Sequence, residues 1–188
     1  SNFLRLWSTT SSDMDWFNDE YWNTIAENLK LYAKAVNAAK ARGIVFDVEP
    51  YEQLGKNPWA FMDKAGTLFY PEKTLEDVQA QVRKRGAQFM EALQSEKPDI
   101  TLLCSLLLGA ARNDAENYYI NKPERRTYAL LPAFVDGMLD VIGSEVTIVD
   151  GRIPYKDLAG TYYFDDTRKF AFAYDYVRGA STFVSPEN

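Results

Sequence analysis

Residues 43–51 read Gly43-Ile44-Val45-Phe46-Asp47-Val48-Glu49-Pro50-Tyr51, an apolar run that contains two acids and ends at a proline. The pattern predicts a strand from Ile44 to Glu49 that Pro50 closes. Alternate side chains of a strand share a face, so Asp47 and Glu49 are expected to point together. The opposite face carries Ile44, Phe46 and Val48, which we expect to pack against helices.

Strand-like and helix-like segments alternate on both sides of this run. Upstream, we expect a strand at residues 3–7 and a helix at about 22–41, which Gly43 ends as a left-handed cap. Downstream, a long loop precedes a helix that begins with an approximate capping box, Thr74 to Asp77. Further strands are expected at residues 100–108, 128–135 and 145–150, and a further helix at 166–179.

This alternation predicts an α/β fold with parallel strands and right-handed crossovers, specifically a parallel (β/α) barrel of the TIM type. A closed barrel has eight strands and typically about 250 residues. The chain has 188 residues and about five expected strands. We therefore expect residues 1–188 to form a single domain that is an incomplete barrel or a portion of a longer chain. A doubly wound sheet fits the strand count, but its Gly-x-Gly-x-x-Gly turn is missing.

The composition excludes several classes of function. Histidine is absent, so Ser-His-Asp and Cys-His nucleophile systems and the usual zinc sites cannot be built from this chain. A net charge of −6 disfavours nucleic-acid binding. No apolar stretch approaches the roughly 18 residues that a membrane span requires. Nothing in the sequence calls for a metal or another cofactor. Cys104, the single cysteine, lies in an apolar run and is expected to be a buried, unreactive thiol.

The pair Asp47 and Glu49 carries the chemistry that we expect. Their side chains lie roughly 7 Å apart along one face, at about 3.3 Å per residue, at the strand end where barrels of this kind place their active sites. Two nearby carboxylates cannot both ionise freely, so one pKa rises and that group keeps its proton. We assign the general acid to Glu49, with Asp47 orienting it. The alternative is that both acids form salt bridges or cap a neighbouring helix.

The same run resembles the end of the signature strand of family 18 chitinase-like hydrolases, Asp-x-x-Asp-x-Asp-x-Glu. This resemblance implies that Glu49 is the acid and that Asp47 helps to position the acetamido group of a substrate. Arg42 and Val45 stand where that family has its two earlier Asp residues. A looser resemblance, over most of the chain, is to uncharacterised barrel hydrolases that carry Phe-Asp-x-Glu-Pro-Tyr and a later Val-Asp-Gly. It implies an extracellular or periplasmic location.

Two other acids end apolar segments that we read as strands. Asp136 precedes Gly137, and Asp150 precedes Gly151. Either acid is a candidate for the nucleophile or base opposite Glu49, and Asp150 is favoured because its strand is clearer. Asp-Gly is also a common turn pair, so a turn is the alternative for each.

Aromatic side chains in the expected loops are candidates for binding a sugar, because aromatic rings offer flat apolar platforms to the C–H faces of sugars. The alternative for such residues is core packing. The candidates for substrate binding are Trp7, Tyr51, Trp59 and Tyr155.

These observations favour a glycoside hydrolase that cleaves a poly- or oligosaccharide by carboxylate acid/base catalysis. A non-catalytic carbohydrate-binding barrel is the alternative, since the earlier Asp positions of the motif are not acidic. A third hypothesis is a lyase or isomerase that uses Asp47, Glu49 and another acid as Mg²⁺ ligands. The sequence does not specify the sugar, the linkage or the oligomeric state.

Overall fold

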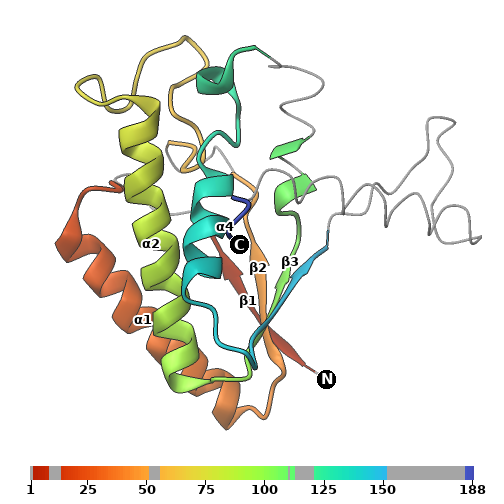
Figure 1. Ribbon diagram of the computed structural model, residues 1–188. Helices are drawn as coiled ribbons and strands as arrows, with labels where there is room; N and C mark the ends of the chain where they lie inside the picture. The colour runs from red at the N-terminus through yellow and green to blue at the C-terminus, as the bar shows by residue number, and fades with distance from the viewer. Residues whose placement is uncertain (1, 9–13, 51–55, 110, 113–120, 152–184) are drawn as a thin grey trace, which may run out of the picture.

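The computed structural model describes residues 2–8, 14–50, 56–109, 111–112, 121–151 and 185–188. Four parallel strands form one sheet, in the order β1-β2-β3-β4 (Figure 1). The strands are β1 (Phe3–Trp7), β2 (Gly43–Asp47), β3 (Thr101–Cys104) and β4 (Thr147–Asp150). The helices are α1 (Asp19–Ala38), α2 (Leu75–Glu96), α4 (Leu131–Asp140) and a 3₁₀ turn at Pro123–Arg125. The predicted α/β class and parallel pairing are therefore confirmed.

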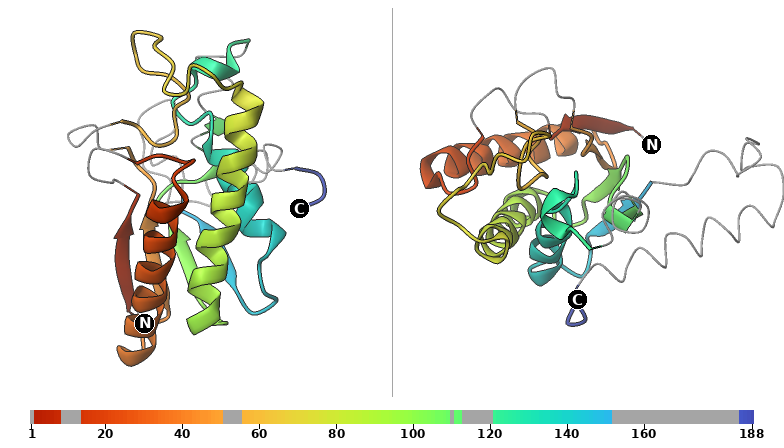
Figure 2. Two further views of the ribbon diagram at one scale, coloured as in Figure 1. Left: turned by 90° about the vertical axis from the view of Figure 1, so that its left-hand side faces the viewer. Right: turned by 90° about the horizontal axis from the view of Figure 1, so that it is seen from above.

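Helices α1, α2 and α4 cover one face of the sheet (Figures 1 and 2). The side chains of β2 that were expected to pack against helices lie on this face. Ile44 and Phe46 are buried beneath the helices. The other face carries a row of side chains in register across the sheet, which is not covered by any described helix. That row contains Arg5, Val45, Leu103 and Val149.

Helix α1 begins at a side-chain cap and buries one stripe. The Asn18 side chain accepts a hydrogen bond from the amide of Tyr21, and the buried residues recur at helical spacing from Trp22 to Val36. The predicted cap at Gly43 is wrong, because the left-handed residue after the helix is Lys40, with φ 51°. Gly43 lies in β2, where a Cβ atom would come within 1.8 Å of the Thr101 carbonyl oxygen.

Helix α2 begins at the predicted capping box, with both arms formed. The amide of Asp77 donates to the Thr74 hydroxyl at 3.1 Å, and the Asp77 carboxylate accepts from the amide of Thr74 at 3.0 Å. The buried face of the helix runs from Val78 through Leu93. This helix packs against both α1 and α4.

The predicted strand at residues 128–135 is wrong, because Leu131–Asp140 form helix α4. Pro132 fits the first turn of a helix, where its missing N–H has no partner to lose. Phe134, Val135 and Met138 recur at helical spacing and are buried against α2 and the sheet. The expected helix at 166–179 lies outside the described residues. Nowhere in the described part of the chain is a helix long and apolar enough to cross a membrane.

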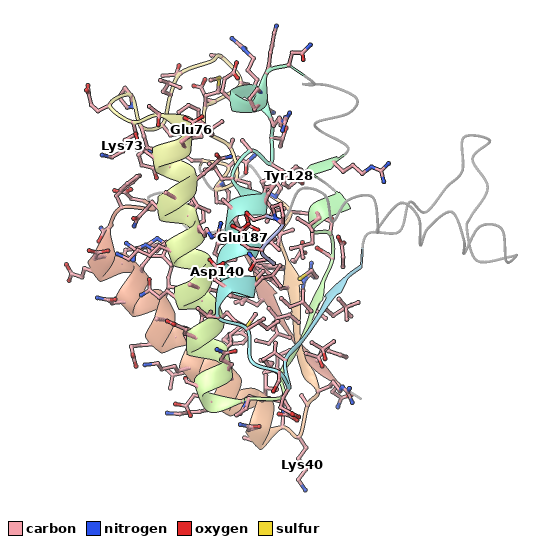
Figure 3. All side chains as sticks on the ribbon, in the orientation of Figure 1. Lys40, Lys73, Glu76, Tyr128, Asp140 and Glu187 are labelled. Carbon is pink, nitrogen blue, oxygen red and sulfur yellow. The ribbon has the colours of Figure 1, made fainter. Side chains whose placement is uncertain are left out.

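Residues 185–188 are held against α4 by a polar network. Asp136 accepts hydrogen bonds from the amide and hydroxyl of Ser185, both at 2.8 Å. Arg83 of α2 donates to both carboxylate oxygens of Asp140, at 2.7 and 2.6 Å, and to Glu187 at 3.4 Å. Figure 3 shows Asp140 and Glu187 beside each other at α4. The network joins α2, α4 and this last segment.

The network predicts a pH dependence of stability. Hydrogen bonds from Arg83 lower the pKa of Asp140 below its ordinary value of 3.8. Because the pKa is lower in the folded state than in the unfolded state, the stabilisation is present above the unfolded value. It is lost as the pH falls through the folded value. We expect Asp140→Asn to reduce the free energy of unfolding at neutral pH by on the order of 1 kcal/mol.

Urea unfolding of the wild type and of Asp140→Asn, from neutral pH to below the folded pKa of Asp140, measures this effect. The difference between their free energies of unfolding should disappear as the pH falls. Glu145→Gln, at an exposed acid between α4 and β4, is the control. A difference between wild type and Asp140→Asn that stays constant over this range would contradict the prediction.

Candidate functional site

Asp47 lies at the carboxyl end of β2 and is only 4% exposed. One carboxylate oxygen, Oδ2, accepts from the Arg5 guanidinium at 2.7 Å. The other, Oδ1, accepts from the Ser105 hydroxyl at 3.0 Å and from the amide of Glu49 at 3.2 Å. Both oxygens of this buried carboxylate therefore have partners from three places in the sequence.

Parallel register explains why these groups meet. Trp7 of β1 pairs with Asp47, and the amide of Ser105 donates to the Phe46 carbonyl, so all three strand ends lie at one edge of the sheet. Arg5 stands two residues before Trp7, which places it on the face that Asp47 shares. The ion pair joins β1 to β2 and the Ser105 hydrogen bond joins β2 to the end of β3.

Glu49 is half-buried and lies two residues beyond Asp47. The Asp47 carboxylate holds the amide of Glu49, a local side chain–backbone hydrogen bond that fixes the chain as it leaves the strand. Asp47 thus positions the residue to which the sequence assigns the acid. Its negative charge is balanced by Arg5, which sequence reasoning did not pair with it.

Trp7 presents an exposed ring at the same edge. It is 56% exposed, and the Arg5 guanidinium carbon lies 4.7 Å from its ring centroid. Arg5 therefore contacts both the indole and the Asp47 carboxylate. The exposed indole is therefore an apolar surface next to a charged pair.

Asp150 ends β4, as the sequence predicts, but in a different row of the sheet. It pairs in register with Cys104, in the row that contains Phe46 and faces the helices. Its Oδ2 accepts from the amides of Leu108 and Gly109 at 3.1 and 3.4 Å. These bonds anchor the segment that follows β3, which is a structural role.

Asp136 does not end a strand. It lies on α4, is 7% exposed, and uses its carboxylate to hold Ser185 and Asn188. The prediction that placed it opposite Glu49 depended on a strand that the structure replaces with a helix. Asp136 therefore belongs to the helix layer and is not part of the site at the sheet edge.

Among the predicted sugar-binding residues, Trp59 is a core residue. It is 2% exposed, its indole N–H donates to the Val48 carbonyl at 2.7 Å, and its ring contacts those of Trp16 and Phe134. Tyr51 and Tyr155 lie outside the described residues.

Cys104 is fully buried, as predicted, and burial raises the pKa of its thiol, with a further contribution from the charge of Asp150. No group of three or more acidic or cysteine side chains within the described ranges is arranged to hold a metal ion.

The site therefore consists of Asp47, Glu49, Arg5, Ser105 and Trp7, at the carboxyl ends of the first three strands. Comparison with known proteins adds no relative: no protein-family model, no curated protein and no solved structure matches this chain.

Proposed function

We propose that this protein is a glycoside hydrolase acting on a poly- or oligosaccharide, with Glu49 as general acid and Asp47 as the residue that positions it. The observation that carries the proposal is the buried Asp47 carboxylate, which accepts a hydrogen bond from the amide of Glu49 at 3.2 Å. The exposed Trp7 pairs with Asp47 on the neighbouring strand. Acid, positioning group and sugar platform thus share one edge of a parallel sheet.

A barrel-type architecture is part of this proposal. Consecutive strand order with α1, α2 and α4 on a single face supports this architecture, because a (β/α) barrel is built in the same way. A doubly wound sheet instead reverses its strand order and covers both faces with helices. In a barrel, the face that carries Arg5 and Val45 is the interior, and the carboxyl ends of the strands form the mouth.

The chemistry follows from the different surroundings of the two acids. Arg5 and Ser105 bind both oxygens of Asp47, which holds this carboxylate in a fixed position. Glu49 lies beyond the strand end and is half-exposed, so a leaving glycosidic oxygen can reach it. A protonated Glu49 donates its proton to that oxygen as the bond breaks.

The test is Glu49→Gln in the full-length protein, assayed against a panel of glycans by product analysis. We expect turnover to fall by about 10²- to 10⁴-fold, the usual contribution of a general acid, with an unchanged circular dichroism spectrum. Glu91→Gln, at an exposed acid on α2, is the matched control and should retain full activity. Hydrolysis that survives Glu49→Gln on every responsive glycan would refute the assignment.

Glycan binding without hydrolysis is the second candidate function, and one observation favours it. The Asp47 carboxylate is engaged by Arg5 and Ser105, and the Asp150 carboxylate holds two amides, so both carboxylates are already bound by donors of the protein itself. If this reading holds, wild-type protein binds a glycan by calorimetry without releasing product. Trp7→Ala should then weaken glycan binding. Neither the wild type nor Glu49→Gln should release product.

A further inference from the structure

We draw no further inference here: the strongest candidate, the face of the sheet that carries the row Arg5, Val45, Leu103 and Val149 and that no described helix covers, is a largely apolar surface, and nothing in the structure shows what covers it.

Discussion

Gly137→Ala is expected to destabilise the protein by about 3 kcal/mol or more, at or above the usual upper limit for overpacking. Gly137 lies on α4 against α2, and a Cβ atom there would come within 1.8 Å of the Arg83 carbonyl oxygen. The obstructing atom belongs to the backbone of a neighbouring helix, so no side-chain rotation relieves the overlap. The two helices would have to separate, and with them the core beneath them.

The free energy of unfolding, measured by urea denaturation, checks this expectation. Gly143→Ala is the matched control, because the nearest atom to a Cβ there is the end of the Gln94 side chain at 3.4 Å. We expect it to change stability by less than about 0.5 kcal/mol. Equal stability of Gly137→Ala and Gly143→Ala would show that α2 and α4 do not pack this closely.

Phe134→Ala is expected to cost about 3–5 kcal/mol, the range observed when a buried phenylalanine is truncated to alanine. Phe134 is 2% exposed and lies at the centre of the aromatic core. Its ring centroid lies 5.3 Å from that of Trp59, 5.4 Å from that of Phe89 and 6.0 Å from that of Trp16. Removing it leaves a void among the rings of Phe89 on α2, Phe46 on β2 and the two tryptophans.

Thermal and urea unfolding of Phe134→Ala measure this cost, with Leu31→Ala as the control. Leu31 is 62% exposed on α1, so its truncation should change stability by less than about 0.5 kcal/mol. If Phe134→Ala lowered the free energy of unfolding no more than Leu31→Ala does, the aromatic cluster would contribute little to the stability of the core.

Local pattern was sufficient for much of the fold. The strand at β2 follows from its apolar alternation, and the start of α2 follows from the capping residues Thr74 and Asp77, whose hydrogen bonds are made within four residues. Helix α4 was missed because the apolar run around Leu131 is nearly continuous, and periodicity alone cannot distinguish a buried helix from a strand in such a run. Pro132, which lies within the strand predicted at residues 128–135, was the signal for a helix start.

Less of the site followed from the sequence. The strand predicted from Ile44 to Glu49 places Asp47 and Glu49 on one face, but β2 ends at Asp47, two residues before Glu49. The partner Arg5 is 42 residues from Asp47 in the chain. That pairing depends on the register between β1 and β2, which no local pattern specifies. Similarly, Asp150 was correctly placed at a strand end, whereas the row of the sheet to which it belongs depends on its alignment with Cys104.

The strand order also has a consequence for how the chain folds. Each strand pairs with the one that precedes it in sequence, so no parallel pairing of the described sheet skips a strand. Loop-closure entropy grows with loop length, and contacts between sequence neighbours favour rapid folding. The sheet can therefore grow by successive additions, starting from β1 and β2, whose pairing around α1 closes the shortest of the three loops.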